Sequence, residues 1–269
     1  MSIIFVRQNA TGSGDGSSWA DAYKTLSAAI ADATNGDDCW RAQGSYTPGT
    51  SRADTLLLTK EIDIYGGFVG KENQRSARDW QRNLTILSGE IGDLSSTDDN
   101  SHHVVSSSSG AIATLDGVII ESGNTEGSIT DDGGGVYNNK GTLTLKNTIV
   151  RANQSADDGG GLRNDGALVT SFFRGGGGLL YTQGASATLI NSSFSNNLAP
   201  NGVAIRNDGQ LILSNATLSG NNATSSIGGG GGLSNSTGSV EIFNSTITNN
   251  TAIGLGAGVA TTSTVTVAN

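Results

Sequence analysis

Apolar and polar positions recur along residues 133–258 with a period of twenty-odd residues. Within each repeat an aliphatic residue lies two positions before an asparagine, and a second apolar residue lies three positions after it. Four asparagines share this place in their repeats: Asn147, Asn191, Asn215 and Asn244. The alternation predicts short strands, and the glycine and asparagine between them predict tight turns. A fixed period of this length is typical of a repeat protein.

A single repeat of this kind cannot bury its own apolar side, so the repeats are expected to stack on one another. Stacking at a strand spacing of about 4.8 Å would place each residue against its counterpart in the next repeat. The aliphatic columns would then form the core, and the shared asparagines would point inward and bond along a ladder. The predicted fold is therefore all-β, a right-handed parallel β-helix (solenoid) with the usual hand of parallel crossovers.

The spacing of the repeats is uneven. Asn147 and Asn191 are 44 residues apart (191 − 147), which is too long for one repeat and too short for two. We assign the missing repeat to residues 167–174, which lack the asparagine, and interpret them as a truncated coil. Asn215 and Asn244 are 29 residues apart (244 − 215), and the glycine-rich segment 225–232 supplies the extra length as a loop.

The N-terminal half of the chain is less regular. Strands are expected at residues 3–6, 56–65, 84–88 and 112–122. The one convincing helical pattern lies within residues 19–34, with Thr25 as its expected N-cap and Leu26, Ala29, Ile30 and Ala33 at helical spacing. An open end of a β-helix exposes apolar core and unpaired strand edges, so we expect this α-helix to be an N-terminal cap.

These features predict one β-helix domain over residues 1–269. Residues 1–45 would form the cap and the first coil, residues 46–132 irregular coils with loops, and residues 133–269 the regular repeats rich in glycine and asparagine. The sequence stops within a repeat, so we expect either a fragment of a longer protein or an end that stacks on a second copy. End-to-end stacking would give a homo-oligomer or a filament.

Composition narrows the class of protein. Forty glycines, two prolines and 5% aromatic residues suit many tight turns and small inward side chains. The net charge of −9 argues against nucleic acid as a partner, because no basic stripe is present to neutralise phosphates. The single cysteine, Cys39, excludes an intrachain disulfide. No stretch approaches the roughly 20 apolar residues of a transmembrane helix.

The N-terminal residues, MSIIFVRQN, do not read as a cleavable signal, because there is no basic n-region and the apolar run is short. We nevertheless expect an extracellular or cell-surface protein. Its signal has then been removed from this chain, or export uses another route.

Several N-terminal segments resemble a bacterial family of β-helix proteins found in cyanobacteria and planctomycetes. The matching segments are residues 9–19 (NATGSGDGSSW), 44–48 (GSYTP), 65–70 (YGGFVG), 78–80 (RDW) and 86–92 (ILSGEIG). The repeats are similar to those of chlamydial polymorphic outer-membrane proteins, which alternate a Gly-Gly-small-apolar motif with Phe-x-x-Asn, as at residues 194–197. The resemblance implies the fold and a surface or secreted location, while Cys39 and Arg41 depart from the aliphatic residues expected in the first coil.

Two acidic pairs precede glycine triplets in successive repeats. Asp131 and Asp132 lie 26 residues (157 − 131) before Asp157 and Asp158, which is one coil. Stacking would bring four carboxylates to one corner about 5 Å apart, and such crowding requires protons or a cation. Calcium accepts clusters of oxygen ligands, so these four residues are a candidate calcium site. The alternative is a solvated corner, in which Arg174 pairs with Asp158.

A second column contains aromatic and basic side chains just after the start of each repeat: Tyr137, Arg163, Tyr181 and Arg206. If the short coil keeps register, these side chains would stack as cation–π pairs. The strip is a candidate carbohydrate-facing surface. The alternative is a surface ladder whose members satisfy one another.

Catalytic patterns are sparse in this sequence. Polysaccharide lyases, epimerases and hydrolases of this fold need a base with a charge neutraliser, or two carboxylates across a groove. His102 and His103 lie beside Asp98 and Asp99, but adjacent residues of a strand face opposite sides, so a shared metal site is not expected. The charged residues of the repeats recur by column, which favours a scaffold over a unique catalytic centre.

We therefore expect a non-catalytic secreted or cell-surface β-helix protein, such as an adhesin, a matrix component or a passenger-type scaffold. Its partners would be cell-surface or matrix components, including polysaccharide. The first alternative is a carbohydrate-active enzyme that acts on an acidic polysaccharide. The second is a surface binder with a flat threonine face, although Thr142 and Thr144 do not recur down their column.

Overall fold

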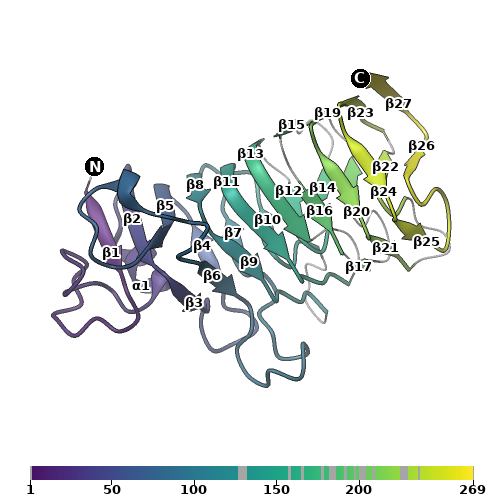
Figure 1. Cartoon of the computed structure of the whole chain (residues 1–269). Helices are drawn as coiled ribbons and strands as arrows, with labels where there is room; N and C mark the ends of the chain where they lie inside the picture. Colours follow the sequence, from purple (N-terminus) through teal and green to yellow (C-terminus); the bar gives the residue numbers. More distant parts are fainter. Residues whose placement is uncertain are drawn as a thin grey trace.

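The computed structural model of the chain describes residues 2–126, 132–156, 159–164, 167–176, 179–181, 186–190, 193–196, 198–199, 204–207, 210–224, 230–235 and 237–268. Over these residues the protein is mostly β, with parallel sheets, one α-helix and one 3-10 helix. The strands follow one another along the molecule in sequence order, and the two termini lie at opposite ends (Figure 1).

Three parallel sheets contain the described strands. The largest is formed by β1 (Ile3–Val6), β2 (Asp37–Ala42), β3 (Gly44–Tyr46), β5 (Glu61–Phe68), β6 (Thr85–Ser88), β8 (Ile112–Asp116), β9 (Ile119–Glu121), β11 (Thr142–Arg151), β13 (Ala167–Gly176), β15 (Ser186–Ile190), β16 (Ser193–Ser195), β19 (Gln210–Ser214), β20 (Thr217–Ser219), β23 (Ser239–Phe243), β24 (Thr246–Thr248) and β27 (Thr264–Ala268). The second is formed by β4 (Leu56–Leu58), β7 (Val105–Ser107), β10 (Val136–Asn138), β12 (Leu162–Asn164), β14 (Leu179–Tyr181), β18 (Ile205–Asn207), β22 (Leu233–Asn235) and β26 (Val259–Thr261). The third is formed by β17 (Leu198–Ala199), β21 (Asn222–Ala223) and β25 (Thr251–Ala252).

Each strand of the regular region pairs in parallel with its counterpart one repeat later. Leu143 of β11 pairs with Leu168 of β13, and Leu168 pairs with Ala187 of β15. The second step covers only 19 residues (187 − 168), against 25 (168 − 143) for the first. The shortened repeat expected at residues 167–174 is therefore present, and its residues lie within the ten-residue strand β13.

Alternating burial along the strands creates a continuous apolar core. One cluster of buried side chains extends from Ile4 to Ile242. The aliphatic column predicted from the repeat lies inside it, because Leu145, Leu189 and Leu213 are fully buried and Ile242 is 4% exposed. Leu115 pairs with Leu145, and Leu189 pairs with Leu213, so each of these side chains packs on a leucine of the adjacent repeat.

The prediction that the shared asparagines point inward is wrong. Asn147, Asn215 and Asn244 have backbone φ angles of 49°, 54° and 46°, and Asn215 and Asn244 are exposed. Asn215 lies between β19 and β20 and Asn244 between β23 and β24, whereas Asn147 lies within β11. At each of them the chain turns through the left-handed conformation, which asparagine tolerates better than most residues. Asn191 lies outside the described residues.

Other asparagine columns form the interior ladders. Asn138 donates from Nδ2 to Asn164 Oδ1 at 2.6 Å, and Asn207 donates to Asn235 Oδ1 at 2.8 Å. At another corner Asn221 donates to Asn250 Oδ1 at 2.7 Å. A side-chain amide both donates and accepts, so it can bond to its own copy in the repeat above and below.

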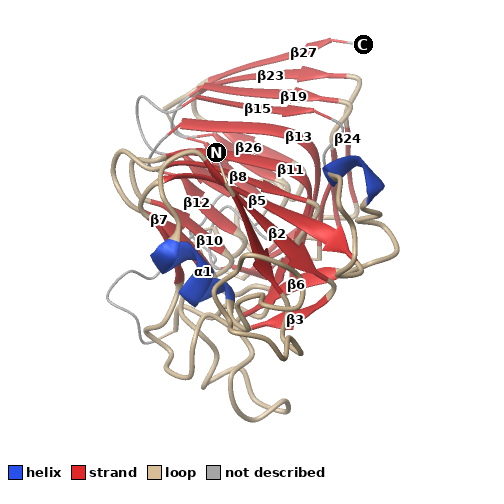
Figure 2. Cartoon of the chain, turned by 90° about the vertical axis from the view of Figure 1, so that its left-hand side faces the viewer, coloured by secondary structure: helices blue, strands red, loops and turns tan. Residues whose placement is uncertain are grey.

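The helical pattern near the N-terminus corresponds to α1 (Leu26–Asp32), which is shorter than the segment that contains it. Thr25 is its N-cap, as predicted, and accepts a hydrogen bond from the Ala28 amide. At the other end Lys60 Nζ donates to Ala31 O at 2.9 Å, which satisfies a carbonyl of the last turn. The helix packs against β1 and β4, and its buried residues are Leu26, Ala29 and Ile30. Figure 2 shows α1 in blue on the side of the molecule that is at the left in Figure 1.

Replacing Leu115 by alanine should lower the free energy of unfolding by about 2–5 kcal/mol, because the truncation leaves a cavity in the core. Ile112 of the same strand is 53% exposed, so Ile112→Ala is the matched control and should change it by about 0.5 kcal/mol or less. Denaturant midpoints of the two variants give the comparison. Equal losses would contradict the assignment of inward and outward positions in β8.

Removing one rung of an asparagine ladder should also destabilise the protein. Asn221→Ala leaves Asn250 Oδ1 without its side-chain donor, and we expect a loss of about 1–3 kcal/mol in the free energy of unfolding. Asn222 is exposed, so Asn222→Ala should have little effect. Thermal unfolding of both variants tests this, and an unchanged midpoint for Asn221→Ala would count against the ladder.

Candidate functional site

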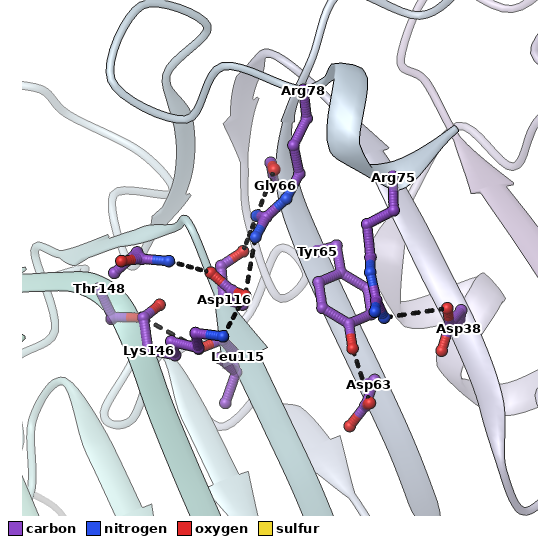
Figure 3. A network of polar contacts seen from close by, with 11 residues as sticks. Asp38, Asp63, Tyr65, Gly66, Arg75, Arg78, Leu115, Asp116, Lys146 and Thr148 are labelled. Carbon is purple, nitrogen blue, oxygen red and sulfur yellow. Dashed lines mark hydrogen bonds and ion pairs between the residues drawn. The ribbon is translucent and has the colours of Figure 1, made fainter. Parts of the chain in front are cut away.

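A network of charged side chains lies on the outer face of the largest sheet (Figure 3). Asp116 is 2% exposed. Its carboxylate oxygen Oδ2 lies 2.7 Å from Arg78 Nη2 and 4.0 Å from Lys146 Nζ. Asn147 Nδ2 donates to the other oxygen of Asp116 at 2.7 Å. Arg78 also donates to the carbonyl oxygens of Asp116 and Gly66, each at 3.1 Å. The carboxylate therefore joins two repeats to the segment that carries Arg78.

Further contacts of the same surface segment lie closer to the N-terminus, around the ring of Tyr65. Arg75, in η1 (Arg75–Ala77), lies over the Tyr65 ring at 4.5 Å and reaches Asp38 at 3.7 Å. The Tyr65 hydroxyl donates to Asp63 at 2.8 Å, and burial together with this carboxylate raises the pKa of Tyr65. Asp38 also has a raised pKa, chiefly because its burial disfavours the charged form. These contacts fasten a surface segment to the sheet.

The first coil accommodates Cys39 and Arg41 at fully buried positions. The Arg41 guanidinium lies 3.3 Å from the centre of the Tyr46 ring, and burial lowers its pKa to about 9. Its nitrogens have no hydrogen-bond acceptor among the described residues. Burial raises the pKa of the Cys39 thiol to about 12, so this cysteine is unreactive at neutral pH.

Two ion pairs of different burial allow a matched test. Asp116→Asn should cost about 3–5 kcal/mol, because Arg78 would remain largely buried without its counter-charge. Arg151→Gln breaks the more exposed pair with Glu121 and should cost less than about 1 kcal/mol. Denaturant unfolding at low and high salt distinguishes the two. A similar small loss for both variants would contradict a structural role for Asp116.

Only one of the four aspartates predicted to form a calcium site is described. Asp132 forms an ion pair with Arg163 of the following repeat. This guanidinium supplies positive charge at the corner where a cation was expected. Asp131, Asp157 and Asp158 lie outside the described residues, as does the pairing of Arg174 with Asp158. Calcium binding by the quartet therefore stays a prediction.

The aromatic and basic column is only partly in register. Tyr137 pairs with Arg163, as expected, but Arg163 pairs with Leu180, and Leu180 pairs with Arg206. Tyr181 instead lies opposite Asn164, so its place in the predicted column is wrong. The error arises because β14 begins at Leu179, so Leu180 and not Tyr181 lies opposite Arg163. The use of this strip by carbohydrate stays a prediction.

The two histidines lie in a loop and contact different backbone carbonyls. His103 Nδ1 is 3.0 Å from Gly133 O, and its ring stacks on Tyr137 with centroids 5.3 Å apart. His102 Nδ1 is 3.3 Å from Asn124 O. Burial lowers the pKa of His103, which keeps the ring neutral at physiological pH. Within the described part of the chain, no group of three or more His, Cys, Asp or Glu side chains is placed to hold a metal ion.

His103 should make stability depend on pH. Because its pKa is lowered by folding, the unfolded chain takes up a proton near the ordinary histidine pKa of about 6.5, whereas the folded chain does so only at lower pH. The free energy of unfolding should therefore decrease as the pH falls through this window. Denaturant midpoints between about pH 7.5 and pH 5 measure the decrease.

His103→Asn should flatten this decrease, and His102→Asn is the matched control that should retain it. A wild-type midpoint that stays constant over the same pH range would contradict the assigned environment of His103.

A cleft of about 400 Å³ lies where a loop folds against one corner of the repeats. Its walls are Glu90, Leu94, Ser95, Ser96, Thr97, Asn100, Ser122, Gly123, Ala152, Asn153, Gln154, Asn196 and Leu198. Ser122, Ala152 and Asn196 have φ angles of 63°, 50° and 56°, so the floor of the cleft is a row of left-handed corner residues from different repeats. The cleft therefore runs across several repeats and not within one.

Hydrogen bonds hold the loop that forms the other wall. The Ser101 amide donates to Gly89 O at 2.8 Å, and Asn124 Nδ2 donates to Thr97 O at 2.9 Å. Arg52 Nε donates to Asn100 O at 3.0 Å. The base of the loop is thus tied to the strand that precedes it and to the repeat that follows.

Two side-chain oxygens of this cleft accept no hydrogen bond. Glu90 Oε1 and Asn100 Oδ1 are inaccessible to solvent and have no donor in the described part of the protein. Asn100 is 1% exposed and Glu90 is half-buried. Buried acceptors without a donor cost free energy, and because neither atom is accessible to solvent, both lie behind the surface of the cleft and not on it.

The sequence places these residues among the irregular coils and loops of residues 46–132, and it does not reveal the cleft. The only signal was the position of Glu90 two residues after the strand expected at residues 84–88, in a segment outside the regular repeats. The opposing wall could not be recognised, because Ser122 and Ala152 are not residue types that predict a left-handed turn.

Comparison with protein-family models, with curated proteins and with solved structures found no match to this chain. No helix in the described ranges has both the length and the hydrophobicity needed to span a bilayer.

Proposed function

We propose that the chain is a right-handed parallel β-helix that serves as a non-catalytic scaffold, secreted or exposed on a cell surface. The in-register parallel pairing of successive repeats supports this architecture. The resemblance to bacterial β-helix repeat proteins and to chlamydial polymorphic outer-membrane proteins remains part of the proposal, as does the assignment of the whole chain to one domain.

The observation that carries the proposed role is that carboxylates form ion pairs with basic side chains distant in the sequence. Asp116, Glu121 and Asp132 each pair with a basic residue 30 or more positions away or in the adjacent repeat. Each of these carboxylates has a basic partner that ties it to another repeat or to a surface segment, so its charge serves to hold the stack together. These ion pairs therefore support a structural role for the chain.

The second candidate is a carbohydrate-active enzyme, and the cleft at Glu90 favours it. A glycosidase of the common kind uses two carboxyl groups on opposite sides of the scissile bond. Glu90 is the one carboxylate among the described lining residues, so a hydrolytic pair is not assembled there. The scaffold is therefore the stronger proposal.

A calcium ion at Asp131, Asp132, Asp157 and Asp158, and self-association end to end, belong to the same proposal. Calcium would tie adjacent repeats at one corner, as the ion pair of Asp132 with Arg163 already does. Thermal unfolding with and without millimolar calcium tests the ion, because binding to the folded state alone raises the midpoint.

Turnover assays separate the two candidate functions. The protein is incubated with a panel of neutral, amino and uronic polysaccharides, and reducing ends and unsaturated uronate products are measured. We expect no product above that of a heat-denatured sample. Product formation that is lost in Glu90→Gln and retained in Glu241→Gln, an exposed control, would overturn the scaffold in favour of the enzyme.

A further inference from the structure

We infer that the loop between Gly89 and Ser101 encloses a calcium ion, which is held by side-chain oxygens of Glu90, Asp99 and Asn100. The inference goes beyond the proposed scaffold and does not depend on it. The site is also separate from the calcium quartet predicted at the corner of the repeats, because it shares no residue with that quartet.

Three oxygens of this loop are closed off from solvent and accept no hydrogen bond within the described protein: Glu90 Oε1, Asp99 Oδ1 and Asn100 Oδ1. An ionised carboxylate and an amide carbonyl only accept, so these atoms cannot satisfy one another. The buried Ser101 hydroxyl has no partner either, so it does not donate to any of the three. Acceptors that are buried together without a donor indicate an electropositive partner inside the loop and not a ligand on the cleft surface.

The closure of the loop brings these residues together. The Ser101 amide donates to Gly89 O at 2.8 Å, so Glu90 and Asn100 follow this closure on its two sides, and both line the same cleft. Asp99 Oδ2 accepts a hydrogen bond from the Asp93 amide at 2.6 Å, which leaves Oδ1 without a donor. A Cβ at Gly92 would collide with the Asp99 carboxylate, so this glycine lets the carboxylate lie against the segment that follows Glu90.

The charge of the region favours a cation. Residues 84–139 contain no lysine or arginine, whereas the loop contains four carboxylates: Glu90, Asp93, Asp98 and Asp99. In the described protein none of the four forms an ion pair, in contrast to Asp116, Glu121 and Asp132. Arg52 lies beside the loop and donates to Asn100 O at 3.0 Å. With its positive charge counted, the loop and Arg52 together carry a formal charge of −3 (1 − 4).

The chemistry of the three oxygens selects calcium. Calcium binds carboxylate and amide oxygens together and completes its shell with backbone carbonyls and water. The set contains no imidazole or thiolate, which zinc and copper prefer. It contains two carboxylates and one amide, so it differs from a cluster of three acidic or histidine side chains. A single water molecule cannot donate to all three oxygens and would leave the two carboxylates without a counter-charge.

The ion can exchange with solution and would clamp the loop. Glu90 and Asp99 are half-buried, so other atoms of these residues reach the surface although Oε1 and Oδ1 do not. Glu90 lies just after β6, and Asn100 lies a few residues before β7. An ion shared by these residues would hold the two ends of the loop together, and it would stabilise the folded chain because the unfolded chain has no preformed site.

The test is isothermal titration calorimetry on the whole chain, freed of metal with EDTA, exchanged into chelator-free buffer and titrated with calcium chloride. It is made in the double variant Asp131→Asn with Asp157→Asn, which removes carboxylates of the quartet that belongs to the proposed function. We expect one calcium ion per chain, with a dissociation constant of about 0.1–1 mM.

In this background Glu90→Gln and Asp99→Asn should each weaken calcium binding about tenfold or more, because each removes a charged ligand. Asp98→Asn is the matched control, since it removes an exposed carboxylate of the same loop and should change the affinity about twofold or less.

Thermal unfolding distinguishes a calcium ligand from a carboxylate with a structural role alone. In EDTA, Glu90→Gln and Asp99→Asn should unfold at or above the midpoint of their parent, because each relieves the repulsion between the two carboxylates. In millimolar calcium the midpoint of the parent and of Asp98→Asn should rise, and that of the other two should not. Lower midpoints for both ligand variants in both media would contradict the inference.

Three titration results would overturn it: no calcium binding in the quartet-free variant, unchanged affinity in both Glu90→Gln and Asp99→Asn, or equal weakening by Asp98→Asn. If the quartet-free variant does not fold, the unaltered chain takes its place, and Glu90→Gln must then remove one bound ion. Failure of the proposed function looks different, because it appears as turnover of polysaccharide or as loss of the quartet's ion, and neither alters binding in the loop.

Discussion

Parallel, in-register pairing between successive repeats is the constraint on which the rest of the structure depends. It places each side chain against the same position of the next repeat, so every column must be compatible with itself. Leucine columns satisfy this condition by packing, and interior asparagines satisfy it because an amide both donates and accepts. Charged residues satisfy it where opposite charges are stacked, as Glu121 and Arg151 are. Asp38 and Asp63 are also register partners, and they contact Arg75 and the Tyr65 hydroxyl instead.

The repeat made much of the fold predictable, but the conformation of the turns could not be predicted. The column of Leu145, Leu189, Leu213 and Ile242 and the N-cap at Thr25 followed from spacing alone, since both depend on local periodicity. The corner asparagines were assigned inward because their spacing is as regular as that of the core. The left-handed backbone that places them outside is a property of the turn, which the sequence pattern does not display.

The candidate site was harder to predict than the fold, because it breaks the repeat. In the structure Tyr181 lies one position away from its predicted column, opposite Asn164. Counting residues along the motif could not reveal this shift. The cleft requires a loop outside the repeats to fold against Ser122 and Ala152. The missing donors of Glu90 Oε1 and Asn100 Oδ1 become visible only in three dimensions, as do the missing acceptors of Arg41.

Disulfide cross-linking of paired positions tests the central claim of in-register stacking most directly. Thr114 and Thr144 are paired and half-buried, so the double variant Thr114→Cys with Thr144→Cys should place its Cα atoms about 5 Å apart, within the range for a disulfide. Cys39 is buried and will not compete. The account predicts rapid cross-linking of this pair under mild oxidation. Thr114→Cys with Lys146→Cys, offset by two residues and about 8 Å apart, should not cross-link, and preferential cross-linking of the offset pair would contradict the account.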